Sequence, residues 1–154
     1  MLADSDIEES PKLMKHLAVM ILGSFILFQA PASEKLASGT YVVYAASPQI
    51  WRVKFDPKTM ANATITGHFI VTDGNPKNID VLVFDQQNYV KWTDDDPQVR
   101  TSAKPIASAS RSGEGNINAK LADPGFHYLV ISDQHEYEGK KTVSADFKFQ
   151  YDRH

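Results

Sequence analysis

The chain has 154 residues and a formal net charge of −3, with 42% hydrophobic and 23% charged residues. These values are typical of one globular domain and argue against wholesale disorder, and so small a charge creates no field that would attract nucleic acid or an anionic membrane. The absence of cysteine excludes disulfides, thiolate metal sites and a cysteine nucleophile.

The first 32 residues have the pattern of a secretory signal peptide. Residues 17–28 (LAVMILGSFILF) form an uncharged run, which is too short to span a membrane because a span needs about 20 apolar residues. Lys15 and His16 precede this run, and Ala30, Pro31 and Ala32 follow it. A basic region, an apolar core and a small-x-small site together predict cleavage after Ala32. We therefore expect export to the periplasm or the extracellular space, with no transmembrane anchor after cleavage.

The segment before Met14 does not fit this pattern, because its charge has the wrong sign for the start of a signal peptide. It carries two aspartates and two glutamates against one lysine, Lys12. Our hypothesis is that translation starts at Met14 and that residues 1–13 are a misassigned extension. The alternatives for residues 17–28 are a buried core helix or an uncleaved anchor. The expected organisation is a signal peptide over residues 1–32 and one domain over residues 33–154.

From residue 39 onward the dominant hydrophobic period is two, which is typical of half-buried antiparallel strands. Apolar and polar residues alternate in residues 51–56 (WRVKFD), and again in residues 63–72, 116–121 and 142–151. Residues 41–46 (YVVYAA) indicate a further strand. Residues 88–92 are predicted to form a short strand, joined to the preceding one by a tight link at residues 86–88 (QQN).

Two segments are apolar on both faces, residues 79–84 (IDVLVF) and 126–131 (FHYLVI). Such runs are typical of central strands that are covered or closely flanked on each side. We expect Val81, Val83, Leu129 and Phe147 to be almost fully buried.

Turn residues separate these segments at 73–76 (DGNP), 123–125 (DPG) and 138–139 (EG). No part of the chain after residue 32 has a convincing helical period with caps. About eight short strands with regular turns predict an all-β fold, an antiparallel two-sheet sandwich of the jelly-roll type. Residues 93–105 (TDDDPQVRTSAKP) are the longest segment without a strand signal, and a loop of this length is usually functional or mobile.

No catalytic constellation or cofactor motif is recognisable, so we expect a protein that is not an enzyme. The histidines lack the spacing of a zinc protease, and no Gly-x-Ser-x-Gly elbow is present. His68 is expected on the polar face of a strand. His127 lies in a buried strand, where a histidine is more often a hydrogen-bonded core residue than a metal ligand. The remaining catalytic alternative is a minor hydrolase with an unrecognised pair of carboxylates.

Calcium is the one metal with weak candidates, because loop carboxylates are the ligands that it prefers. The spacing is not that of the helix-loop-helix calcium motif, and three consecutive aspartates cannot all point inward. The other interpretation is a solvated acidic loop that protects a sheet edge, and we predict no metal site on balance. The candidates are Asp80, Asp85, Asp94, Asp95 and Asp96, and two further loop acids are Asp73 and Asp133.

Two aromatic residues, Tyr89 and Trp92, lie beside the acidic residues. A partly exposed tryptophan is suited to stacking on a sugar or anchoring a protein partner. Trp92 could equally be a plug of the core, as we expect for Trp51, which is in phase with Val53 and Phe55. The predicted binding residues are Tyr89, Trp92, Asp94, Asp95 and Asp96, with a protein or a glycan as the partner.

Residues 78–92 (NIDVLVFDQQNYVKW) are followed by residues 115–117 (GNI) and 121–132 (LADPGFHYLVIS). This order resembles the Golgi-dynamics (GOLD) domain and its bacterial GOLD-like and pre-peptidase C-terminal relatives. Those families pair an "I-D-V-x-V-x-D" strand with a later "L-x-P-G-x-Y-x-L-x-I-S" strand, and the resemblance covers roughly residues 69–151. It implies an eight-stranded jelly-roll sandwich that serves as a binding or accessory module. The eukaryotic version has a disulfide that this chain lacks, so no functional residue is carried over.

The expected function is therefore that of an exported, non-catalytic binding module of GOLD-like type, which presents residues 89–105 to its partner. The alternative from another class is a structural envelope protein that self-assembles through its sheet edges.

Overall fold

The computed structural model describes residues 30–45, 47–134 and 139–154. The predicted signal-peptide core at residues 17–28 lies outside these residues. Ala32, after which cleavage is predicted, begins the first strand, and Ser33 pairs with Gln150 in the neighbouring strand. Within the described part of the chain, no helix is long and apolar enough to cross a membrane.

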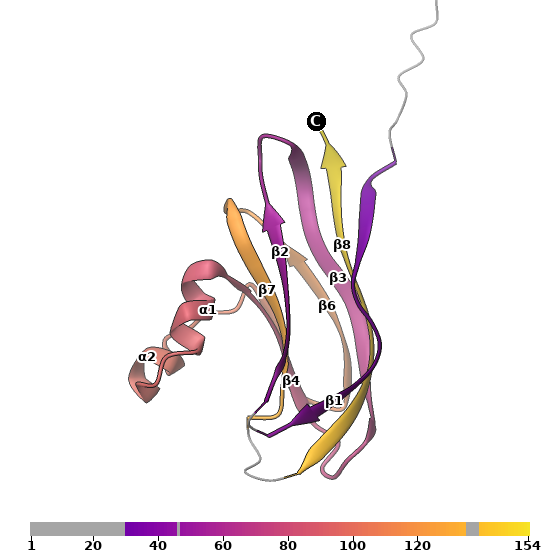
Figure 1. Ribbon diagram of the computed structural model, residues 1–154, viewed down its shortest axis with the longest axis vertical. Coiled ribbons are helices and arrows are strands. Elements are labelled where there is room, and N and C mark those ends of the chain that lie inside the picture. Colours follow the sequence, from indigo (N-terminus) through magenta and orange to yellow (C-terminus); the bar gives the residue numbers. More distant parts are fainter. Residues whose placement is uncertain (1–29, 46, 135–138) are drawn as a thin grey trace, which may run out of the picture.

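Eight strands and two short helices make up the described chain (Figure 1). In order they are β1 (Ala32–Tyr44), β2 (Gln49–Phe55), β3 (Met60–Asp73), β4 (Ile79–Asp85), α1 (Gln86–Trp92), α2 (Pro97–Thr101), β5 (Ala107–Ser112), β6 (Glu114–Lys120), β7 (Gly125–Ser132) and β8 (Lys140–Arg153).

The strands form two antiparallel four-stranded sheets with the orders β1-β8-β3-β6 and β2-β7-β4-β5. In four consecutive pairs the two strands lie in opposite sheets: β1 and β2, β3 and β4, β5 and β6, and β7 and β8. The chain therefore crosses repeatedly between the layers, as in a jelly roll. The predicted all-β two-sheet sandwich is confirmed.

The period-two segments supply the core between the sheets, because one face of each strand points inward. Val81, Val83, Leu129 and Phe147 are each 0% exposed, as predicted. Trp51 packs at the margin of this core and meets Tyr41 edge to face at 4.9 Å between ring centroids.

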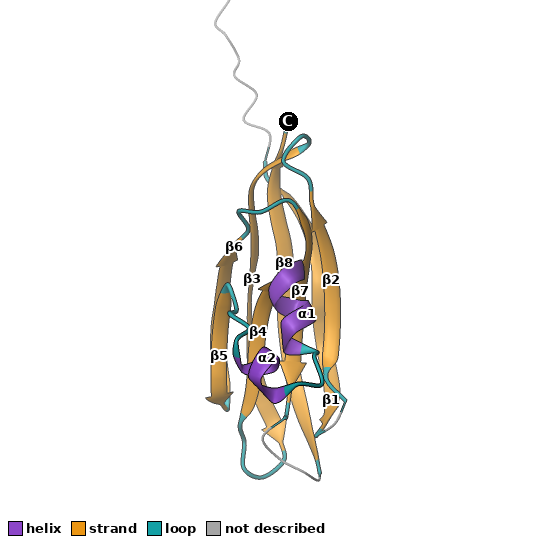
Figure 2. Cartoon of the chain, turned by 90° about the vertical axis from the view of Figure 1, so that its left-hand side faces the viewer, coloured by secondary structure: helices purple, strands orange, loops and turns teal. Residues whose placement is uncertain are grey.

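The two fully apolar segments form β4 and β7, the paired central strands of the sheet β2-β7-β4-β5. Their outer faces are covered by the segment that contains α1 and α2, which lies against this sheet (Figure 2). A second apolar cluster results, separate from the main core. Its buried members are Leu82, Phe84, Tyr128 and Val130, and the residues packed on them are Tyr89, Trp92, Ala103 and Phe126.

The prediction of a strand over residues 88–92 and a loop over residues 93–105 is wrong, because both segments contain helix. Asp85 is the N-cap of α1, and its carboxylate accepts hydrogen bonds from the backbone N–H of Asn88 at 2.7 Å and from its Nδ2 at 2.8 Å. Asp96 caps α2 in the same way, directly before Pro97. An aspartate before a first turn and a proline within it are helix-start signals, so the local sequence contained evidence for both helices.

The strand β5 was absent from the prediction. Its sequence, ASASRS, consists mostly of small polar residues and lacks the β-branched and aromatic residues typical of strands. Among the described strands it is an edge strand next to β4, so its position in the sheet depends on pairing with a strand more than 20 residues earlier in the chain.

Candidate functional site

The helical segment holds the predicted aromatic binding residues against the sheet. The ring of Tyr89 stacks on that of Tyr128, with centroids 3.8 Å apart and an interplanar angle of 6°. Trp92 lies one helical turn further along α1, 5.8 Å from Phe84 and 6.2 Å from Tyr89. Both side chains are half-buried. Each therefore combines packing on the sheet with a solvent-facing edge.

A hollow of about 220 Å³ opens beside Trp92, between the helices and one end of the sheet. Trp92, Thr93 and Arg100 line it from the helical segment. Ser132 and Gln134 line it from the end of β7, and the β1–β2 connection closes it with Ala45 and Pro48.

Arg100 is held in place at this hollow. Its Nε and Nη2 groups both donate to the carbonyl oxygen of Asp94, at 3.0 and 2.8 Å. A guanidinium has five N–H donors, so donors remain for a ligand. The indole Nε1 of Trp92 is buried and has no hydrogen-bond partner among the described residues. The hollow thus combines an aromatic wall with a fixed cation.

The predicted acidic residues are not gathered around one point. Asp94 accepts a hydrogen bond from the Asp96 backbone N–H at 2.9 Å, and Asp96 accepts one from Gln98 at 2.8 Å. Asp80 is buried and accepts one from the backbone of Arg111 at 2.8 Å. Asp95 is exposed. In the described ranges, no three His, Cys, Asp or Glu residues are close enough to hold a metal ion.

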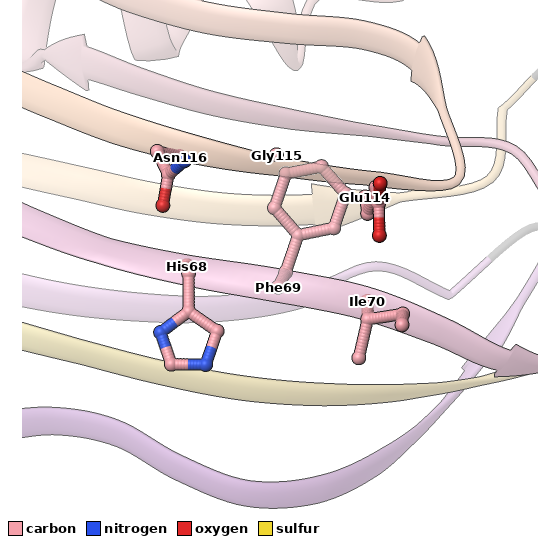
Figure 3. Close-up of a pocket in the computed structure, with 6 residues that line it drawn as sticks. All are labelled: His68, Phe69, Ile70, Glu114, Gly115 and Asn116. Atoms are coloured by element: carbon pink, nitrogen blue, oxygen red, sulfur yellow. The ribbon is translucent and has the colours of Figure 1, made fainter.

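A second hollow of about 510 Å³ lies on the other sheet, along β3 and β6 (Figure 3). His68 pairs with Asn116 in the strand register, and Ile70 pairs with Glu114. His68 is exposed on the polar face, as predicted. The figure shows His68 and Asn116 on separate strands with no contact between their side chains. Glu114 and His68 bring a carboxylate and an imidazole to this hollow.

His127 is a buried core residue of β7, as expected. It is 1% exposed, and neither ring nitrogen has a hydrogen-bond partner in the described part of the chain. Burial lowers its pKa, although the Gly125 backbone and the carboxylates of Asp85 and Asp123 act in the opposite direction. Phe55 packs against the imidazole at 6.5 Å between centroids.

The surroundings of Asp85, the N-cap of α1, and of Tyr89 within α1 shift the pKa values of both side chains. Burial acts to raise the pKa of Asp85, but hydrogen bonds from Asn88 and Gln87 and the nearby His127 outweigh it, so this pKa is lowered. Burial, together with Tyr128, raises the pKa of Tyr89. Asp85 is therefore held as a carboxylate that stabilises the first turn of α1.

Sequence reasoning missed a buried polar cluster at the end of the sandwich where β4 and β8 begin. Lys141 is 3% exposed and Asp133 is 1% exposed, and they form an ion pair at 2.9 Å. Lys141 Nζ also contacts the backbone oxygen and the side-chain Oδ1 of Asn78, at 2.7 and 2.8 Å. The alternation along β8 could have revealed this lysine, because Lys141 lies two residues before Val143 and four before Ala145, on the same inward-facing side of the strand.

No family model matches this chain, and no curated protein matches it. The resemblance to GOLD-like domains therefore stays a prediction. Of the segments that resemble those domains, residues 78–92 contain β4 and α1, and residues 121–132 contain β7. The strands β4 and β7 are antiparallel neighbours in one sheet.

Proposed function

We propose that the protein is an exported, non-catalytic binding module of GOLD-like type. It binds a partner protein, with one side chain of the partner inserted into the hollow beside Trp92. The observation that carries this proposal is the pairing of the half-buried indole with a guanidinium that is already held in place by the Asp94 carbonyl.

The size of the hollow favours a single inserted group. About 220 Å³ is less than the roughly 300 Å³ that a drug-sized ligand occupies. Partner proteins are commonly anchored by one side chain in a pocket with an aromatic or arginine wall. The inserted side chain would pack on Trp92 and accept a hydrogen bond from Arg100, so a carboxylate or an amide suits it best.

The sandwich acts as a rigid mount for this site. Tyr89 stacks on Tyr128 of β7, and Asp85 and Asp96 cap the two short helices. Pre-ordered side chains lose little conformational entropy when a partner binds. The helical segment can therefore present its residues without rearranging.

The test is a binding screen against a peptide library and a glycan array, with intrinsic fluorescence as a second readout. A Trp51→Phe background leaves Trp92 as the only tryptophan, since the chain has two. We expect Arg100→Gln to weaken peptide binding at least tenfold without changing the melting temperature, because removing a charge-assisted hydrogen bond costs about 1.5–3 kcal/mol.

Gln98→Ala is the matched control, because Gln98 is exposed on the same helix and does not line the hollow. Equal binding by Arg100→Gln and Gln98→Ala would exclude this hollow as the site. Binding to glycans and not to peptides would overturn the choice of partner.

A further inference from the structure

The Lys141 cluster joins three segments that are far apart in the chain. Asn78 precedes β4, Asp133 follows β7, and Lys141 lies at the start of β8. Sixty-three residues separate Asn78 from Lys141, and eight separate Asp133 from Lys141. Lysine is almost never fully buried unless it is paired. The fold therefore brings the Lys141 amine, the Asn78 amide and the Asp133 carboxylate into contact at a site where the amine and the carboxylate are buried.

The distances in this cluster resemble those of a reactive arrangement. Lys141 Nζ is 2.8 Å from Asn78 Oδ1, and a carbonyl bond is about 1.2 Å long, so the amide carbon lies within about 4 Å of the amine. Reacting atoms in enzymes are held about 3–3.5 Å apart. A small rotation of the Asn78 amide would present its carbon to the amine.

Asp133 has the features of a proton-transfer group in this arrangement. Its Oδ1 contacts Lys141 Nζ at 2.9 Å. Its Oδ2 is buried and has no hydrogen-bond partner among the described residues. Buried polar atoms are usually satisfied, and an exception calls for a reason. A carboxylate that accepts a proton from the amine and later releases it needs such an open oxygen.

We propose that Lys141 and Asn78 form an intramolecular isopeptide bond, with Asp133 transferring the protons. This proposal is independent of the binding site beside Trp92.

The reaction needs no external reagent. Asp133 takes a proton from the Lys141 ammonium, and the neutral amine attacks the Asn78 side-chain carbon to form a tetrahedral intermediate. Asp133 returns the proton to the amide nitrogen of Asn78, and the carbon–nitrogen bond breaks. The attacking nitrogen also loses its second proton, which Asp133 accepts and passes to solvent, so the products are one secondary amide, one molecule of ammonia and one released proton. Asn78 is half-buried, so ammonia can leave towards solvent.

The consequence would be a covalent link between the two sheets, because β8 and β4 belong to different sheets. Without the bond, the ion pair alone gives little net stability, since burying both charges offsets much of their attraction. A cross-link restricts the unfolded chain, as a disulfide does. The chain has no cysteine, so this bond would supply the restraint that disulfides supply in other exported domains.

The decisive measurement is mass spectrometry of the folded wild-type protein after trypsin digestion. Trypsin cleaves after Lys77, Lys91, Lys140 and Lys148 but not after a cross-linked Lys141. We expect a branched peptide of residues 78–91 and 141–148, lighter by one ammonia than the sum of its two parts. Recovery of residues 78–91 and 142–148 only as separate linear peptides would overturn the proposal.

Variants test the role of each group. Asn78→Ala and Lys141→Arg should give no branched peptide, and both should lower the melting temperature. Asp133→Asn keeps the shape of the cluster but cannot accept a proton, so it should leave the chain linear. Lys140→Ala is the matched control, since Lys140 is exposed and adjacent, and it should retain the cross-link. Formation of the bond in Asp133→Asn at the wild-type extent would remove Asp133 from the mechanism.

Discussion

At the scale of single residues, His127 is a titratable group that the fold buries almost completely, at 1% exposure. Its neighbours are the Phe55 ring, the Gly125 backbone and the carboxylates of Asp85 and Asp123. Burial is the largest influence on its pKa, and it favours the neutral imidazole. His127 is therefore neutral in the folded domain under conditions where an exposed histidine takes up a proton.

We predict that this histidine makes the domain less stable in mild acid. The unfolded chain protonates His127 at its ordinary pKa of about 6.5, while the folded chain does so only at a lower pH. Between those two values the unfolded state binds more protons, so the free energy of unfolding falls as the pH falls. Urea unfolding from about pH 7.5 to about pH 5 would measure this slope.

His127→Gln should reduce this slope. Asp85 also titrates, but its lowered pKa affects stability only at a more acidic pH, below the 3.8 of an ordinary aspartate. An unchanged slope in His127→Gln would show that other groups control the acid response.

At the scale of elements, α1 is a short helix whose existence depends on its cap and on its packing. A helix of 7 residues is too short to be stable alone. Asp85 stabilises it from one end, and Tyr89 and Trp92 attach it to the sheet. Losing either contribution should loosen the wall of the hollow beside Trp92.

We predict that Asp85→Ala lowers the free energy of unfolding by about 0.5–2 kcal/mol, the usual cost of removing an N-cap. Asp95→Ala should stay within about 0.5 kcal/mol of the wild type, because Asp95 is exposed. Denaturant unfolding of both variants gives the comparison. If the two variants were equally stable, the capping interaction would contribute nothing measurable.

At the scale of the whole molecule, stability comes from the inner faces of two sheets that pack together. Leu129 in β7 and Phe147 in β8 lie on opposite sheets and are both fully buried. In β8 the next residue, Lys148, points to solvent, whereas in β7 both neighbours of Leu129 are buried under the helical segment. In β8, therefore, a substitution has a large or a small effect according to whether its side chain points inward or outward.

We predict that Leu129→Ala lowers the free energy of unfolding by about 2–5 kcal/mol, from lost burial and the cavity left behind. Lys148→Ala should change it by no more than about 0.5 kcal/mol. Equilibrium unfolding in urea measures both values. Similar decreases in the free energy of unfolding for the two variants would contradict the assignment of Leu129 to the core and Lys148 to the surface.

The sequence alone was enough to predict the fold class and most of the core, because hydrophobic alternation is local information. The pattern of residues 142–151 assigns Phe147 to the inner face and Lys148 to the outer face without knowledge of any partner strand. It also identified β4 and β7 as strands covered on both sides. The capping signals of Asp85 and Asp96 were present too. The aromatic residues of α1 suggested a strand, and α2, with 5 residues, is too short to show a helical period.

Only the tertiary structure decided what covers the outer faces of β4 and β7, which segments line the hollow beside Trp92, and where Asn78, Asp133 and Lys141 meet. Asn78 directly precedes β4 of one sheet, whereas Lys141 lies in β8 of the other, and 63 residues separate them in the sequence. Their contact depends on the strand order and on the packing of one sheet against the other, and no local pattern records either of these. A lysine at an inward position was visible in the sequence of β8, but its carboxylate and amide partners were not, since burial of a charge is stable only where the rest of the fold supplies them.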